Sequence, residues 1–197
     1  ASNRTWIVDP NIKPEDGIST GVTFTQKFLI KDEVSSISVD YFYTHFLNQF
    51  ITDMDVHPNE VHMYNTNATS YSHSVQVELA LKPWKVFEFR TAFKYYDVKA
   101  EFGGELQQKA FVPKYRVFLN AGNKKRNKKR EFDITANWVG KKRLPSTVAH
   151  PVKIQRGNES GGYWGLHSQI TYKIQSIIFY VCGENLLKLN KTDAING

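Results

Sequence analysis

The sequence predicts an all-β fold, namely a segment of an antiparallel, up-and-down transmembrane β-barrel with short turns at one end and long loops at the other. Three observations predict it: apolar and polar residues alternate with period two, short and long connections alternate along the chain, and aromatic residues lie near strand ends. Hydrophobic residues make up 41% and aromatic residues 14% of the 197 residues, which excludes a disordered chain and favours strands.

Residues 71–98 carry the clearest strand pattern. One apolar row comprises Val75, Val77, Leu79 and Leu81, and a second comprises Phe87, Phe89, Phe93 and Tyr95. Mostly polar or charged residues stand between them, so a hairpin is predicted with its turn at residues 82–85. A soluble sandwich would bury the apolar rows in a core, whereas a membrane barrel would turn them to lipid, and alternation alone leaves both open.

Further strands are predicted on either side of this hairpin, after an irregular segment over residues 1–17. They cover residues 18–30, 34–55, 115–122, a stretch in which Phe132, Ile134, Ala136 and Trp138 alternate with polar residues, 163–174 and 177–184. The strand over residues 34–55 is far longer than the usual 5–6 residues, which is typical of a strand that crosses a bilayer and continues into solvent.

The connections between these strands alternate in length. Short ones fall at residues 31–33, 82–85 and 175–176, a modest one at 123–130, and long ones at 56–70, 99–110 and 141–162. All long connections therefore lie at one end of the sheet, as in bacterial outer-membrane barrels with short periplasmic turns and long extracellular loops. Aromatic residues sit near the strand ends, where an interfacial girdle would place them: Trp84, Phe87, Tyr95, Tyr96, Trp138, Tyr163, Trp164 and Tyr172.

Four segments, in this order, resemble the carboxy-terminal part of a TonB-dependent outer-membrane receptor of the Bacteroidetes type. They are PNIKPE at residues 10–15, VDYFY and NQFI within residues 39–51, FVPKYR at 111–116 and GENLLK at 183–188. Tyr115 stands where His is common, Cys182 where a small residue is usual, and Leu187 where Phe or Thr is more familiar. The resemblance implies that residues 1–197 are a partial barrel domain of about eight of 22 strands, without the plug, the early strands and the closing strand.

The resemblance also implies a function. Such a receptor is a multi-pass protein of the Gram-negative outer membrane that takes up a small-molecule nutrient, such as an iron siderophore, haem, cobalamin or a glycan. The TonB-ExbB-ExbD complex would supply the energy, and a surface lipoprotein is a further candidate partner. No enzymatic activity and no cofactor are expected. The alternative from another class is a soluble all-β carbohydrate-binding or adhesion module.

In the barrel interpretation, one set of polar side chains projects into the lumen. It comprises Gln76, Glu78, Glu88, Arg90, Lys94, Arg116, Asn120, Asp133, Asn137, His167, Gln169 and Lys173. Mutual pairing across strands and contact with the plug explain such residues in general. The substrate-binding candidates among them are Arg90, Lys94, Arg116 and His167, although substrate selection is expected mainly in the long loops.

The formal net charge of +7 is concentrated in two clusters. Residues 123–130, NKKRNKKR, hold six of the 26 Lys and Arg residues, and Lys141, Lys142 and Arg143 form the second cluster. The octet is interpreted as a solvated turn rather than a nucleic-acid site, so no nucleic-acid partner is expected. Lys141, Lys142 and Arg143 are predicted to lie on the outer side, where they would contact lipopolysaccharide phosphates.

Other reactive residues form no catalytic or metal motif. Cys182 is the only cysteine, so no internal disulfide is possible, and it is expected to be an inert packed thiol in an apolar strand. Two alternatives have too few ligands to be favoured: His57 with His62 for a metal or haem, and Asp53 with Asp55 for calcium. The glycine pairs at residues 103–104 and 161–162 are predicted turns. The first ten residues show no signal-peptide pattern.

Overall fold

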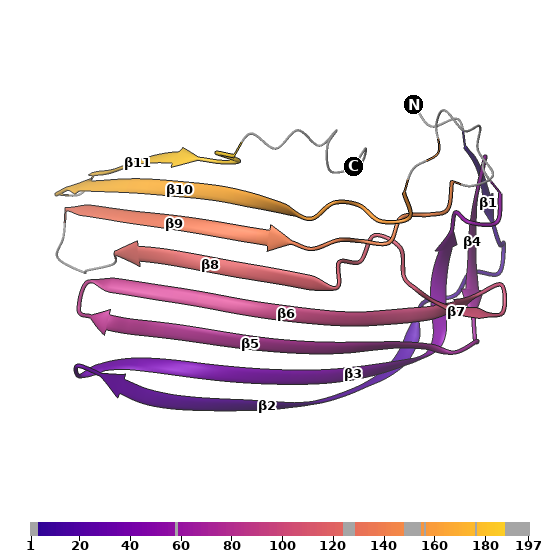
Figure 1. Ribbon diagram of the computed structural model, residues 1–197, viewed down its shortest axis with the longest axis horizontal. Coiled ribbons are helices and arrows are strands. Elements are labelled where there is room, and N and C mark those ends of the chain that lie inside the picture. The colour runs from indigo at the N-terminus through magenta and orange to yellow at the C-terminus, as the bar shows by residue number, and fades with distance from the viewer. Residues whose placement is uncertain are drawn as a thin grey trace.

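A computed structural model describes residues 4–57, 59–123, 129–147, 155, 157–175 and 177–187. Over these residues the chain forms eleven strands in one sheet, which curves without closing (Figure 1). Within the same ranges, no helix has the length and apolar character needed to cross a membrane. The all-β prediction is therefore confirmed.

Eight strands form an antiparallel, up-and-down array in chain order. They are β2 (Asp16–Ile30), β3 (Glu33–Asp53), β5 (Ser70–Trp84), β6 (Phe87–Phe102), β8 (Tyr115–Asn123), β9 (Arg130–Val139), β10 (Tyr163–Ile174) and β11 (Ile177–Gly183). Each pairs with the next of these eight along the chain. These are the eight predicted strands, and their turns at Lys31, Lys85 and Gln175 lie at one end, on the left of Figure 1.

Three short strands correct the prediction of loops and irregular structure at the other end. They are β1 (Thr5–Val8), β4 (Glu60–Thr66) and β7 (Glu105–Gln108). β4 pairs with the far end of β3, and β7 folds back on β6 through Gly103 and Gly104, whose φ angles of 58° and 86° suit a two-residue hairpin. β1 runs parallel to β4. The sequences of β4 and β7 carry only a weak strand pattern. These segments form strands because they pair with the extensions of β3 and β6.

Two turns are tighter than predicted. Lys31 and Asp32 alone connect β2 to β3, with φ angles of 48° and 67°, and Glu33 already pairs with Ile30. The predicted turn at residues 82–85 is also wrong, because β5 continues to Trp84, which pairs with Phe87. A register shift between Leu81 and Trp84 places the extra residue beside Pro83, which has no N–H to donate and is tolerated at a bulge.

The register sorts side chains into an apolar face and a polar face. One directly paired row across seven strands is apolar: Phe24, Val39, Val77, Phe93, Val117, Trp138 and Trp164. The adjacent row on the opposite face is mostly polar: Thr23, Asp40, Gln76, Lys94, Arg116, Val139 and Tyr163. Because side chains alternate along every strand, one register fixes both faces.

The apolar face is not covered by other described parts of the chain. Phe24 is 60% exposed and Ile170 is 64% exposed, whereas a sandwich would bury such side chains between two layers. The buried hydrophobic residues of the described ranges are Ile51, Val61, Ala100 and Phe102, all beyond the long-loop end of the apolar face. The sheet therefore has its small protein core at that end and an open apolar face along most of its length.

Two aromatic belts bound the apolar face. The turn-side belt comprises Trp84, Phe87, Phe132 and Tyr172, with ring centroids 6.2 Å apart for Trp84 and Phe87 and 6.0 Å apart for Phe87 and Phe132. The loop-side belt comprises Tyr43, Tyr71, Tyr95, Tyr115, Trp138 and Trp164, in which Tyr95 and Tyr115 are 5.3 Å apart. Two predicted girdle residues, Tyr96 and Tyr163, belong instead to the polar face by register.

The distance between the belts matches a bilayer. On β6 they are joined by residues 87–95, which is nine residues, and on β10 by residues 164–172, also nine. A tilted strand needs about 9–11 residues to cross the hydrocarbon core. The sheet therefore has the dimensions of a segment of a transmembrane barrel.

Neighbouring residues on β8 test the assignment of the two faces. Leu119 lies on the apolar face midway between the belts and is 40% exposed, while Phe118 lies on the polar face and is 36% exposed. We expect Leu119→Arg to lower the free energy of unfolding by about 2–4 kcal/mol, because its charge enters hydrocarbon. Phe118→Arg should cost clearly less. Denaturant titration of the complete protein in lipid vesicles measures both, and equal losses would contradict the assignment.

Candidate functional site

The polar face carries the candidate site. All twelve side chains predicted for the lumen fall on this face by register. Several of its charged side chains already have partners: Arg90 Nη2 lies 2.8 Å from Glu88 Oε1, Lys173 Nζ lies 2.7 Å from Glu131 Oε1, and Asn120 donates to Asp133 over 2.9 Å. Arg90 thus differs from the other substrate-binding candidates, because it has a carboxylate partner.

Lys94 and Arg116 lie directly opposite each other on β6 and β8. Neither has a carboxylate within ion-pair distance among the described residues, and the nearest carboxylate in their row, Asp40, accepts a hydrogen bond from Thr23 over 2.7 Å. Lys94 Nζ instead lies 4.9 Å from the centre of the Tyr96 ring. Two adjacent cations without a counter-charge favour an anion at this position.

A hollow of about 310 Å³ surrounds this pair, hereafter the basic hollow. Its polar-face lining comprises Gln76, Ala92, Lys94, Arg116, Phe118, Asn137 and Val139. Amide side chains can donate hydrogen bonds to an anion, and Ala92 leaves room above the sheet. The basic hollow therefore has the size and the donor groups to bind a small anionic group.

His167 lies in a second hollow, two strands away from Arg116. This hollow has a volume of about 290 Å³ and is also lined by Asp133, Thr135, Gln169 and Cys182. Cys182 is exposed on the polar face, where its Sγ lies 3.5 Å from Gln169 Oε1, so the expectation of a packed thiol is wrong. The odd-numbered residues of β11 face the apolar side, and the even-numbered Cys182 therefore faces the other.

The metal alternatives gain no support from the geometry. No group of three or more potential metal ligands occurs in the described part of the chain. Both oxygens of Asp53 and both of Asp55 accept hydrogen bonds within the protein. His62 Nε2 lies 2.7 Å from Glu60 Oε2, and His57 Nδ1 accepts a hydrogen bond from the Asn59 N–H over 3.3 Å, so both histidines already have partners within the protein.

Arg143 joins three segments at the long-loop end. Its Nη1 lies 2.8 Å from Asp55 Oδ2, its Nε donates to Gln108 O over 2.6 Å, and its guanidinium lies 5.7 Å from the centre of the Phe102 ring. Asp55 also accepts the Ser146 N–H over 2.5 Å. Residues 88 positions apart are thereby tied together, and no local sequence signal reveals this contact.

The three cations proposed for lipopolysaccharide differ in their surroundings. The Lys141 side chain is 70% exposed and lies 3.5 Å from Glu159, and Lys142 Nζ lies 5.6 Å from the centre of the Tyr163 ring. The Arg143 side chain is only 20% exposed and has Asp55 as an internal partner. The predicted contact therefore depends on Lys141 and Lys142 more than on Arg143.

The loop-end core also contains a perturbed tyrosine. Asp53 is 3% exposed and accepts the Tyr64 O–H over 3.1 Å. Burial, together with the negative charge and the hydrogen bond of Asp53, raises the pKa of Tyr64 to about 12. Ionised Tyr64 would place a second negative charge beside Asp53, so this contact requires the protonated phenol.

Comparison with known proteins identifies the fold. No protein-family model matches the chain, and no curated protein sequence matches it. The FrpB iron transporter from Neisseria meningitidis (F3-3 variant) superposes with a TM-score of 0.62 at 11% identity, covering 94% of this chain and 29% of its own. The ferric-catecholate import receptor Fiu from E. coli K12 has a TM-score of 0.62 at 14% identity, covering 95% of this chain and 26% of its own.

A third solved structure gives the same result. The siderophore receptor PiuA from Acinetobacter baumannii has a TM-score of 0.58 at 15% identity, covering 89% of this chain and 25% of its own. The chain thus spans less than a third of the length of each of these proteins. At such low identity the likeness shows the fold alone, which is that of a segment of a β-barrel.

Tyr64 gives a pH-dependent prediction at the loop end. Because its folded pKa of about 12 exceeds its ordinary value of 10.0, its contribution to stability is complete below pH 10 and is lost as the pH rises through 12. Tyr64→Phe should remove this part of the alkaline loss. Tyrosinate absorbance of the complete protein, compared with that of the variant, reports the titration. A Tyr64 component near pH 10 would contradict the prediction.

Proposed function

We propose that this chain forms part of the barrel wall of a TonB-dependent outer-membrane receptor that imports an iron-siderophore nutrient. The observation that carries the proposal is the open apolar face, bounded by two aromatic belts one bilayer apart, with a polar face behind it. Lipid would cover the apolar face, and water or other parts of the protein would meet the polar face. The likeness to iron transporters and siderophore receptors supports this class of cargo.

This proposal orients the sheet in the outer membrane. The tight turns at Lys31 and Lys85 would face the periplasm, and the end that carries β1, β4 and β7 would face the outside, because barrels of this kind have short periplasmic turns. The Arg143–Asp55 contact would then stabilise the extracellular loops. The rest of the barrel and a plug would belong to the complete protein.

The basic hollow is proposed to contact the cargo on its way through the lumen. Lys94 and Arg116 would attract an anionic group of a ferric siderophore, such as a ferric catecholate, the class for which the structural neighbour Fiu is an import receptor. No bond of the cargo needs to be made or broken, so the function is gated transport. The TonB-ExbB-ExbD complex would supply the energy, and a surface lipoprotein remains a candidate partner.

The soluble alternative would require a different environment for the apolar face. A carbohydrate-binding or adhesion module would need a second layer over residues such as Phe24, Phe93 and Ile134, and none of the described segments supplies one. The folded state of the complete protein should therefore depend on detergent or lipid. A water-soluble folded monomer would favour the alternative.

Charge removal in the basic hollow tests the proposed cargo contact. Lys94→Gln with Arg116→Gln should weaken binding of an anionic ferric catecholate at least tenfold, since hydrogen bonds to charged groups contribute about 1.5–3 kcal/mol. The control is Lys27→Gln with Lys82→Gln, which removes two charges elsewhere from the same face. Equilibrium binding to the complete protein measures both, and equal affinities in the two double variants would contradict the cargo role.

The lipopolysaccharide contact is proposed for the loop-side surface. Lys141→Glu with Lys142→Glu should weaken lipopolysaccharide association, because both cations are replaced by charges that repel phosphate. Arg143 is left unchanged, since its replacement would also break the contact with Asp55. Co-purified lipopolysaccharide per barrel is the measurement, with Lys129→Glu as a control at the opposite end. An unchanged ratio in the double variant would contradict the contact.

A further inference from the structure

The turn-side end carries cations that the proposed transport does not use. Lys31, Lys85, Lys129 and Arg130 are all exposed, and none forms an ion pair with a described residue. The other cations of the basic octet, within residues 124–128, lie outside the described ranges and are not part of the site. The described cations alone therefore leave this rim positively charged.

The carboxylates near this rim do not neutralise these cations. Asp32 follows Lys31 in the β2–β3 turn and Glu33 begins β3, on the opposite side of the array from β9. Glu88 and Glu131 face the polar side, where they pair with Arg90 and Lys173. Next to the apolar face, Lys85 and Arg130 thus have no described counter-charge.

Aromatic rings of the turn-side belt hold two of the cations at the edge of the apolar face. Lys31 Nζ lies 5.4 Å from the centre of the Trp84 ring, and the Arg130 guanidinium lies 5.7 Å from the centre of the Tyr172 ring. Arg130 and Tyr172 are also directly paired across β9 and β10. Such contacts place positive charge at the level of the interface while the donor groups stay accessible.

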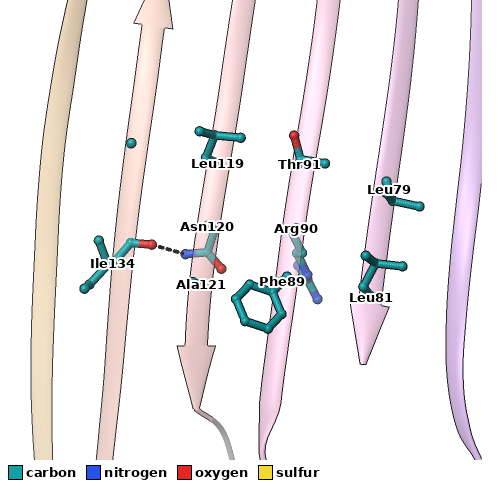
Figure 2. Close-up of a pocket in the computed structure, with 10 residues that line it drawn as sticks. Leu79, Leu81, Phe89, Arg90, Thr91, Leu119, Asn120, Ala121 and Ile134 are labelled. Atoms are coloured by element: carbon teal, nitrogen blue, oxygen red, sulfur yellow. Dashed lines mark hydrogen bonds between the residues drawn. The ribbon is translucent and has the colours of Figure 1, made fainter. Parts of the chain in front are cut away.

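An apolar hollow lies immediately inside this belt, hereafter the apolar trough. Its volume is about 240 Å³, and Figure 2 shows Leu79, Leu81, Phe89 and Leu119 around it. It exists because Thr91, Ala121 and Ala136 are small residues set between these larger ones. An apolar cavity of about 150 Å³ already takes up a benzene molecule, so the trough has room for part of an acyl chain.

The trough and the cations lie at different heights along the strands, with the cations nearer the turns. Ile134 in the trough and Arg130 at the rim are four residues apart on β9, which is about 13 Å. Lys85 follows Leu81 of the trough by the same number of residues, across the bulge. Lys31 is five strands away from Arg130, which is about 24 Å, so these two cations cannot bind the same phosphate.

We propose that this end of the sheet binds an anionic diacyl phospholipid of the phosphatidylglycerol class. Its acyl chain lies in the apolar trough, and Lys85 and Arg130 bind its phosphate at the turn-side rim. The proposal rests on the proposed function, because only a membrane barrel with periplasmic turns exposes this rim to the inner leaflet. Lipopolysaccharide, at the loop-side end, would not reach these cations.

Trp84 provides a local reporter for the test, since it is 53% exposed and lies in the turn-side belt. The complete protein is reconstituted in vesicles, and quenching by brominated phosphatidylglycerol is compared with quenching by brominated phosphatidylcholine. The Trp84 signal is the difference between the protein and its Trp84→Phe variant. We expect a preference for phosphatidylglycerol of roughly fivefold per cation, or about 25-fold in total.

Lys85→Gln with Arg130→Gln should abolish that preference, and Lys141→Gln with Lys142→Gln, at the other end, should retain it. Equal quenching by both lipids in the unmodified protein would mean annular lipid only and would overturn the proposal. A preference that survives in the Lys85 and Arg130 variant would overturn it as well. The absence of quenching by either lipid would instead overturn the proposed membrane function itself.

Discussion

The structure depends on hydrogen bonding between neighbouring strand backbones, in a register that always pairs residues of the same face. A strand surrounded by hydrocarbon must satisfy its N–H and C=O groups through neighbouring strands, since no water is available. Here each of the eight long strands is paired with its neighbour, and every direct pair joins residues of the same face. A shift of one residue between two strands would place charges such as Arg116 on the apolar face.

This register also positions the functional features. It brings Lys94 of β6 opposite Arg116 of β8 on the polar face, and it aligns the aromatic belts at both edges of the apolar face. The bulge beside Pro83 allows β5 to continue to Trp84, which completes the turn-side belt. At the other end, β4 and β7 extend the sheet and, with the Arg143–Asp55 contact, support the connections above the basic hollow.

The sequence predicts the long strands because their alternation is strong, as in residues 71–98. It does not predict β4 or β7, because these form by pairing with distant extensions of β3 and β6 rather than through their own pattern. The prediction for Cys182 is wrong because the residues before it are apolar without alternation, so the sequence does not indicate which of them face which side. Lys94 and Arg116 are recognised as candidates from periodicity, but that they are adjacent depends on the pairing of β6 with β8.

Accessibility along β6 tests the assignment of the faces most directly. Single cysteines at residues 87–95, in a background with Cys182→Ser, carry nitroxide labels in the complete protein in bilayers. Oxygen collects in hydrocarbon and a nickel chelate in water. We expect odd-numbered positions such as Phe89 and Phe93 to be accessible mainly to oxygen, and even-numbered positions such as Lys94 mainly to nickel. Nickel access at Phe89 and Phe93, or no period of two, would contradict the account.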